Sequence, residues 1–186
     1  MCGICGFSGD GDTAVIDRML ASMTHRGPDG HGQWHDGKDL YFGHVRLSIV
    51  DIDTGQQPLV SVDGSLVIMF NGEIYNHVEL RTKLDQSSAS IDWRGHSDTE
   101  TLLACVEAWG IRKTLDLTVG MFAIALWDRS ERRLHLMRDR FGEKPLYYGW
   151  VGGGFVFGSE LKALRRHPNF GNSIDRNVLA LYLQFC

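Results

Sequence analysis

The sequence has few cysteines and prolines, four of each among 186 residues, and no apolar run approaches the roughly 18 residues that a membrane-spanning helix needs. The first residues, MCGICGFSGDGD, lack the basic start and long apolar stretch of a signal peptide. We therefore expect a cytoplasmic protein with no membrane partner and with reduced thiols, since disulfides persist mainly in oxidising compartments. The cysteines lack the spacing of a disulfide framework and lie at Cys2, Cys5, Cys105 and Cys186.

An excess of positive charge is also absent. Nineteen Lys and Arg residues oppose 23 Asp and Glu residues, for a net charge of -4, so nothing in the electrostatics favours a nucleic acid or an anionic membrane as partner. With 43% hydrophobic and 23% charged residues, the composition is that of a folded globular protein. It excludes a disordered chain, a collagen and a coiled coil. The length suits one large domain, or one domain and the start of another.

Hydrophobic periodicity predicts helices and strands over most of the chain. Helices are predicted over Thr13–Thr24, Tyr75–Leu84 and Asp98–Trp109, the last ended by Gly110. Strands are predicted over Gly3–Phe7, Leu40–Leu47, Leu66–Phe70, Met121–Trp127, Arg133–Met137, Leu146–Trp150 and Phe155–Gly158. The glycines at 152–154 predict a hairpin, and the polar segment Asp85–Ser97 predicts a surface loop. Because continuous apolar strands need cover on both faces, we expect an α+β sandwich of packed sheets with helices outside.

Cys2 directly follows the initiator methionine. Methionine aminopeptidases remove Met1 before a small residue, and the mature chain would then begin with a thiol beside its own α-amino group. That amine titrates near ~7.7–8.0, so a neutral fraction can act as base at pH 7, as in an N-terminal nucleophile.

Other interpretations of Cys2 stay open. It can be an accident of composition, or form half of a zinc site with Cys5, although no second pair at suitable spacing completes four ligands. A Cys2–Cys5 redox pair is the third alternative, although such pairs belong at a strand-to-helix junction. Cys5 is most simply a small buried residue of the first strand.

Thiol attack on an amide also requires donors for the developing negative charge. Asn71 and Gly72 suit this role, because the side-chain amide donates and glycine lets a main-chain N–H approach closely. The alternative is that Asn-Gly forms a type I′ hairpin turn, the more frequent use of this dipeptide.

An amino-acid substrate would bring a carboxylate and an ammonium. Arg46 could bind the carboxylate bidentately, or be a surface residue at a strand end. Asp98 and Glu73 could hold the ammonium. Ser97 and Glu100 form a capping-box pattern around Asp98, which would leave the Asp98 side chain free to face a pocket.

Eight motifs in a fixed order carry a resemblance to a known family. They are MCGICG (1–6), HRGPDG (25–30), GHVRLSIVD (43–51), FNGEIYN (70–76), SDTE (97–100), GMFAIALWD (120–128), RDRFGEKPLYY (138–148) and SELKAL (159–164). The set closely resembles the N-terminal glutaminase domain of glutamine-dependent asparagine synthetases over essentially the whole chain.

The resemblance implies a class II glutamine amidotransferase domain with the N-terminal-nucleophile (Ntn) hydrolase fold, a four-layer α/β/β/α sandwich with two antiparallel sheets between helices. The implied roles are nucleophile for Cys2, oxyanion hole for Asn71 and Gly72, carboxylate binding for Arg46, and amino-group binding for Glu73 and Asp98. The HRGPDG motif would be a loop near the nucleophile, with Arg26 more structural than catalytic.

The implied reaction converts glutamine to glutamate and ammonia through a thioester, without a metal or cofactor in this domain. In the family, ammonia passes to a C-terminal synthetase domain that uses ATP and Mg²⁺ to make asparagine from aspartate. Residues 1–173 would be the amidotransferase domain and 174–186 the start of the link, where a new apolar helical pattern stops at Cys186 without a cap. A full-length homodimer, another acceptor such as a uronic-acid sugar, and a non-catalytic regulatory domain stay open.

Overall fold

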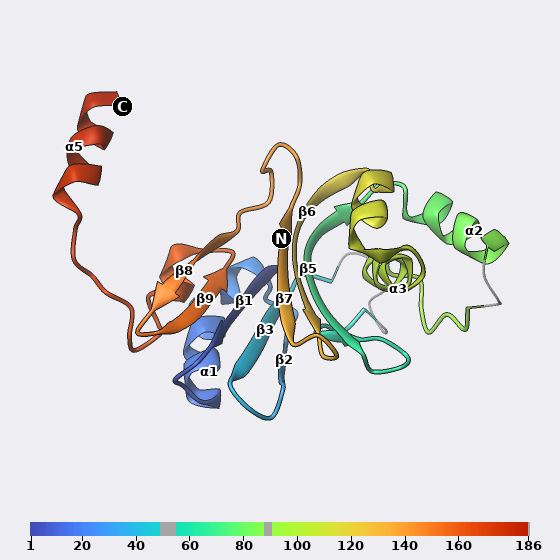
Figure 1. Cartoon of the computed structure of the whole chain (residues 1–186), viewed down its shortest axis with the longest axis horizontal. Coiled ribbons are helices and arrows are strands. Elements are labelled where there is room, and N and C mark those ends of the chain that lie inside the picture. Colours follow the sequence, from blue (N-terminus) through green and yellow to red (C-terminus); the bar gives the residue numbers. More distant parts are fainter. Residues whose placement is uncertain (49–54, 88–90, 186) are drawn as a thin grey trace.

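Two antiparallel sheets form the centre of the computed structural model, which describes residues 1–48, 55–87 and 91–185 (Figure 1). Sheet A has the strand order β2-β3-β1-β9-β8, and sheet B has the order β4-β5-β6-β7. The strands of sheet A are β1 (Gly3–Ser8), β2 (Gly30–His35), β3 (Leu40–Arg46), β8 (Tyr147–Val151) and β9 (Gly154–Gly158). Those of sheet B are β4 (Leu59–Val60), β5 (Leu66–Ile74), β6 (Gly120–Asp128) and β7 (Arg133–Arg138).

Helices cover the outer face of each sheet. The covering helices are α1 (Thr13–Ala21) and α4 (Leu161–Leu164) on sheet A, and α2 (His77–Ser87) and α3 (Asp98–Leu117) on sheet B. The 3-10 helix η1 (Thr24–Arg26) follows α1, and α5 (Arg176–Phe185) covers neither sheet. One apolar cluster joins α1 and α4 to sheet A, and another joins α2 and α3 to sheet B. A third cluster lies between the sheets, with Phe42 from sheet A and Met69 from sheet B among its members. This confirms the predicted four-layer α+β sandwich.

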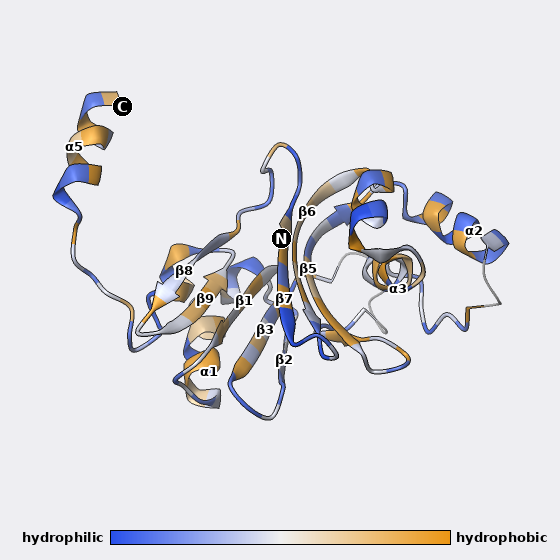
Figure 2. Cartoon of the chain, in the orientation of Figure 1, coloured by the Kyte–Doolittle hydropathy of each residue, from blue (hydrophilic) through white to orange (hydrophobic). Residues whose placement is uncertain are grey.

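Strand β6 shows why the apolar pattern leads to this layering. Phe122, Ile124 and Leu126 belong to the cluster under α2 and α3, whereas Ala123 and Ala125 belong to the cluster between the sheets. Figure 2 shows hydrophobic residues following β5 and β6. Because successive side chains of a strand point to opposite faces, a continuously apolar strand is buried on both, as predicted.

Most predicted elements are present, but several boundaries differ. Helix α1 ends at Ala21 rather than Thr24, and the chain then tightens into η1. Helix α2 begins at His77 rather than Tyr75, and it extends to Ser87, so the predicted loop from Asp85 is a loop only over the described residues 91–97. Strands β2 and β4 were not predicted.

Gly110 interrupts helix α3 without ending it. Its φ of 76° and ψ of 164° are non-helical, yet a second helical segment continues to Leu117. The hydroxyl of Thr114 donates to the Gly110 carbonyl at 2.8 Å, which anchors the start of this second segment. The predicted stop is therefore a kink.

Asn71 and Gly72 lie inside β5 and do not form a turn. Strand β6 pairs with β5 without interruption from Leu66 to Ile74, including Asn71 opposite Ala123. The hairpin-turn interpretation was therefore wrong, because the long pairing with β6 outweighs the local preference of the dipeptide. The predicted hairpin at 152–154 is confirmed between β8 and β9, with Gly152 and Gly153 at positive φ.

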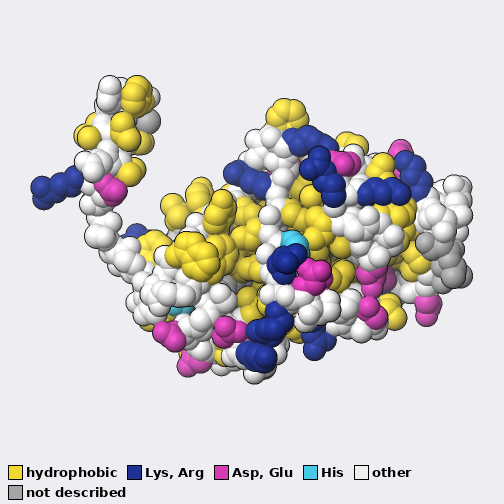
Figure 3. All heavy atoms as spheres, viewed as in Figure 1, with side chains coloured by type: hydrophobic (Ala, Val, Ile, Leu, Met, Phe, Trp, Pro, Cys, Tyr) yellow, Lys and Arg dark blue, Asp and Glu magenta, His cyan; other side chains and the backbone are white. Residues whose placement is uncertain are grey.

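Helix α5 stands apart from the sandwich (Figure 1). It confirms the helical pattern predicted near the C-terminus, but it has no buried residue, and Cys186 lies outside the described residues. Figure 3 shows apolar side chains both on α5 and over β8. No helix in the described part of the chain has the length and apolar character needed to cross a membrane.

Candidate active site

All six predicted site residues line one cavity of about 140 Å³, here called the Cys2 cavity. It lies where the start of β1 and the end of β3 meet β5 and the first residue of α3. Its lining consists of Met1, Cys2, Arg46, Leu47, Gly55, Gln57, Phe70, Asn71, Gly72, Glu73, Ser97, Asp98, Thr99, Met121 and Lys144. Four segments separated in sequence thus bring a thiol, an arginine, two carboxylates and amide donors together.

The thiol of Cys2 is half-buried and lies against the end of β3. Its Sγ accepts a hydrogen bond from the Leu47 N–H at 3.4 Å, and it lies 3.6 Å from the Leu47 oxygen. The main-chain oxygen of Cys2 accepts from Arg26 Nε at 2.9 Å. Met1 precedes it, exposed, with its sulfur 3.4 Å from Lys144 Nζ.

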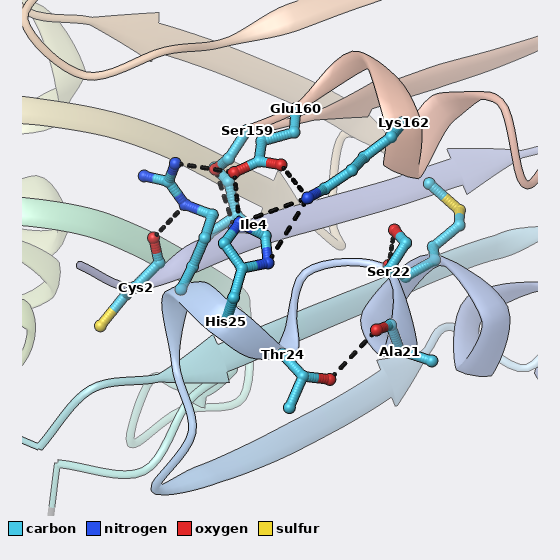
Figure 4. Close-up of polar contacts among 11 residues, drawn as sticks. Cys2, Ile4, Ala21, Ser22, Thr24, His25, Ser159, Glu160 and Lys162 are labelled. Atoms are coloured by element: carbon cyan, nitrogen blue, oxygen red, sulfur yellow. Dashed lines mark hydrogen bonds and ion pairs between the residues drawn. The ribbon is translucent and has the colours of Figure 1, made fainter.

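A charged cluster supports Arg26 beside Cys2. Glu160 Oε1 lies 3.0 Å from Arg26 Nη1 and 2.9 Å from His25 Nε2, while its other oxygen is 3.0 Å from Lys162 Nζ. Figure 4 shows His25 and Lys162 converging on Glu160 near Cys2. Burial alone would raise the pKa of Glu160, but hydrogen bonds from Lys162, Arg26 and His25 hold it at about 2. Glu160 is therefore an anion throughout the neutral range.

Asn71 presents a donor to the cavity. The residue is 1% exposed, and its Nδ2 is buried with no hydrogen-bond partner among the described residues. A buried amide without a partner costs free energy, so the position suits an amide that completes its hydrogen bonding with a ligand. Donation to an anionic oxygen would satisfy it.

Gly72 supplies a second donor through its main chain. Directly after β5, the Tyr75 N–H donates to the carbonyl of Val119, the residue before β6, whereas the Ile74 N–H points to the opposite edge of β5 and donates to Asp98. Because N–H groups alternate between the two edges of a strand, the Gly72 N–H faces the same edge as that of Ile74. A Cβ on Gly72 would lie 2.2 Å from the Met121 oxygen, so close packing against β6 also requires glycine here.

Two carboxylates and one guanidinium complete the site. Arg46 is buried at the end of β3, while Glu73 is exposed at the cavity mouth. Asp98 is held by its Oδ2, which accepts from the Ile74 N–H at 3.0 Å. Burial raises the pKa of Asp98, and a cationic ligand group would counter that effect.

The predicted capping box around Asp98 is only half formed. Ser97 Oγ accepts from the Glu100 N–H at 3.2 Å, as an N-cap should. The Glu100 carboxylate instead accepts from the N–H groups of Arg94 and Gly95 and pairs with Arg81. Asp98 does face the cavity, as predicted.

Two residues that the sequence did not single out also support the site. Gln57 lines the cavity and contacts β5, and His44 contacts β5 from β3. Burial lowers the pKa of His44 to about 4, so its imidazole is neutral. A lone histidine on an apolar strand and a glutamine before a proline carry no local signal for such roles.

Cys5 lies in β1, fully buried under α1, which confirms its predicted structural place. Burial raises the pKa of its thiol and raises that of Cys105 to about 12. Across residues 1–48, 55–87 and 91–185, no group of three or more His, Cys, Asp or Glu side chains is arranged to hold a metal ion.

Comparisons with known proteins identify the family of the chain. A family described as "Glutamine amidotransferase domain" matches residues 1–186. Asparagine synthetase 1 [glutamine-hydrolyzing] of Bacillus subtilis is 40% identical over 171 residues, covering 92% of this chain and 26% of the relative. Asparagine synthetase 2 of Oryza sativa is 39% identical over 170 residues, covering 88% and 28%. The chain thus spans under a third of the length of these relatives.

Solved structures share the fold at lower identity. The glutamine phosphoribosylpyrophosphate amidotransferase of B. subtilis matches with a TM-score of 0.71 at 24% identity, covering 88% of this chain and 43% of that one. A structure described as the allosteric regulatory enzyme of purine biosynthesis matches with a TM-score of 0.73 at 22% identity. These neighbours confirm the Ntn-hydrolase fold expected from the motifs.

Proposed function

The chain belongs to the glutamine amidotransferase domain family, and from this premise we propose that it hydrolyses glutamine to glutamate and ammonia with Cys2 as the nucleophile. One observation carries the proposal. The Cys2 thiol shares a small cavity with the buried Nδ2 of Asn71, which has no hydrogen-bond partner in the part of the chain that the structure describes. A thiol facing a donor without a partner is the arrangement that thiol attack on an amide requires.

Removal of Met1 prepares the nucleophile. It frees the α-amino group of Cys2, whose ordinary pKa near ~7.7–8.0 leaves a neutral fraction as base at pH 7. The amine takes the thiol proton while Sγ bonds to the amide carbon of glutamine. The carbonyl oxygen becomes an oxyanion, bound by Asn71 Nδ2 and the Gly72 N–H.

Two further steps complete the reaction. The tetrahedral intermediate breaks its C–N bond, and the proton held by the α-amine passes to the departing nitrogen, which leaves as ammonia. Water then attacks the thioester, gives its proton to the amine and releases glutamate, and the thiol is restored. In this mechanism the nucleophile, the base and the oxyanion donors are all groups of the protein, so the proposed reaction uses no metal or cofactor in this domain.

The remaining charges select a free amino acid. We assign the α-carboxylate of glutamine to Arg46, whose fork of donors matches a carboxylate. Asp98 and Glu73 take the α-ammonium, and this pairing favours the ionised form of Asp98. The cavity volume of about 140 Å³ suits a small ligand of this kind.

The fate of the ammonia lies beyond these residues. By analogy with the relatives named for asparagine synthesis, we propose that a C-terminal synthetase domain, with ATP and Mg²⁺, transfers it to aspartate. Residues 1–173 would then be the amidotransferase domain, and 174–186 would begin the link. A relative using another carboxylate, such as a uronic-acid sugar, would have the same glutaminase half.

A direct test compares the wild-type protein with Cys2→Ala. Intact mass first establishes that Met1 is removed, and release of glutamate and ammonia from glutamine is then measured. We expect hydrolysis by the wild type, none by Cys2→Ala, and retention in Cys105→Ala, which removes a buried thiol outside the cavity. Activity retained in Cys2→Ala would refute the mechanism. A wild type without Met1 that neither hydrolyses glutamine nor is protected by it from thiol alkylation would indicate a regulatory domain.

A further inference from the structure

Phe70, the residue before Asn71 in β5, has both of its main-chain polar groups bound by side chains. Its N–H donates to Gln57 Oε1 at 2.6 Å. Its carbonyl lies 3.3 Å from His44 Nε2, and because a carbonyl only accepts, that nitrogen carries the proton. The carbonyl belongs to the peptide bond that enters Asn71, so these contacts hold the main chain just before the proposed oxyanion hole.

The Gln57 side chain makes a hydrogen bond to β5 that a longer β4 would make with its main chain. Strand β4 pairs with β5 only at Leu59 and Val60, and this register would put residue 57 opposite Phe70. The main-chain oxygen of Gln57 instead lies against Gly32 of β2, where a Cβ would be only 2.0 Å away. The Gln57 side chain supplies the acceptor that a continued β4 would have offered to Phe70.

The same side chain reaches the other half of the site. Gln57 Nε2 donates to Thr99 Oγ1 at 3.2 Å, and Thr99 is buried next to Asp98 at the start of α3. Farther along the same edge of β5, the Ile74 N–H bonds to Asp98 at 3.0 Å. The Gly72 N–H therefore lies between two hydrogen bonds on this edge of β5, that of Phe70 with Gln57 and that of Ile74 with Asp98.

We propose that Gln57 is a positioning residue that couples the oxyanion hole at Asn71 and Gly72 to the ammonium-binding carboxylate of Asp98. This inference rests on the proposed glutaminase function. One amide fixes the β5 main chain and the first turn of α3 together. The spacing between the oxyanion-hole donors and the Asp98 carboxylate is thereby held by the Gln57 side chain together with the hydrogen bond from the Ile74 N–H to Asp98.

The Gln57 side chain makes two hydrogen bonds, here called its arms, one to the Phe70 N–H and one to the Thr99 hydroxyl. Loss of each arm predicts a different kinetic effect. Loss of the arm to Phe70 loosens donors used most in the transition state, so kcat falls. Loss of the arm to Thr99 loosens Asp98, which binds the substrate before and during reaction, so KM rises. Misplacement of reacting groups by about 1 Å can cost on the order of 100-fold in rate.

The test measures glutaminase kcat and KM of the full chain in a matched set of variants. Gln57→Met, which removes both arms, is expected to lower kcat roughly 10- to 100-fold and to raise KM. Thr99→Val, which removes one arm, is expected to raise KM while kcat stays within about twofold. Gln57→Glu keeps the acceptor for Phe70 and can accept from the Thr99 hydroxyl, so it should recover most of kcat.

Two controls separate positioning from a general loss of structure. Gln33→Met removes a glutamine that bonds exposed Asp17 at 2.5 Å outside the cavity, and it should leave kcat and KM unchanged. Alkylation of Cys2 by iodoacetamide needs no oxyanion hole and should proceed at the wild-type rate in Gln57→Met.

The outcomes distinguish this inference from the proposed function. An active wild type with kcat unchanged in Gln57→Met overturns the positioning role alone, and so does an equal loss of kcat in Gln57→Met and Gln57→Glu. A wild type without glutaminase activity overturns both. If Gln57→Met does not fold, Thr99→Val decides, and an unchanged KM in that variant overturns the coupling to Asp98.

Discussion

The Nε of Arg26 donates a hydrogen bond to the main-chain oxygen of Cys2 at 2.9 Å. The contact joins η1 to the residue before β1, and Glu160 holds the guanidinium from its other side at 3.0 Å. In the proposed mechanism Cys2 becomes the first residue after Met1 is removed, so its orientation would depend on contacts such as this one. The sequence predicts a structural rather than a catalytic role for Arg26, and its contact with the Cys2 main chain is compatible with that prediction.

Glu160→Gln is expected to weaken this support. The amide cannot pair with Arg26, His25 and Lys162 as the carboxylate does, so Cys2 should be less well oriented and kcat should fall while KM changes little. The pKa of Glu160 lies near 2 in the folded protein and below its ordinary value of 4.5. The stability it contributes is therefore present above pH 4.5 and lost as the pH falls toward 2. Denaturant unfolding across that range should show a steeper loss for the wild type than for Glu160→Gln.

Asn71→Ala should reduce kcat by roughly 10²- to 10³-fold, because it removes one donor from the oxyanion hole. KM should change far less, since the donor acts mainly on charge that develops in the transition state. Steady-state glutamine hydrolysis measures both values. Asn71→Asp is the sharper control, because it keeps the shape but replaces the donor with an acceptor. Equal activity in Asn71→Asp and the wild type would contradict the assignment.

Asp98 should give glutamine binding a pH dependence. Burial raises the pKa of this carboxyl, so it becomes neutral at a higher pH than an ordinary aspartate, and a neutral carboxyl no longer pairs with an ammonium. We expect KM to rise as the pH falls from neutral through that raised pKa. In Asp98→Asn, KM should be high at every pH and free of this dependence. A wild-type pH profile retained in the variant would assign the titration to another group.

His44 should make the fold less stable in mild acid. Its pKa is about 4 when folded, against an ordinary 6.5, because burial and nearby Arg46 disfavour the imidazolium. The unfolded chain binds a proton first as the pH falls, so the wild type should lose about 3 kcal/mol relative to a non-titrating variant between pH 6.5 and pH 4. His44→Gln keeps a donor for the Phe70 carbonyl without titrating. Unfolding free energies that differ by a constant amount over this range would refute the expectation.

Local pattern was sufficient for much of the fold. The apolar run at Met121–Trp127 predicted a strand buried on both faces, and β6 is such a strand. The predicted boundaries of strands and helices were less accurate where contacts with residues far away in the sequence determine the boundary. Asn71 and Gly72 resemble a turn by themselves, but nine residues of pairing with β6 extend β5 through them.

The sequence by itself determined the residue types of the site: a thiol at position 2, an Asn-Gly pair, one arginine and two carboxylates, in an order that resembles a known family. Only the tertiary structure decided that these groups meet in one cavity, and that Gln57 and His44 hold the strand between them. The physical reason is that both side chains satisfy main-chain groups of Phe70 left open where β4 ends. The strand register across the whole chain determines which main-chain groups are left unpaired. The local sequence pattern does not predict that register.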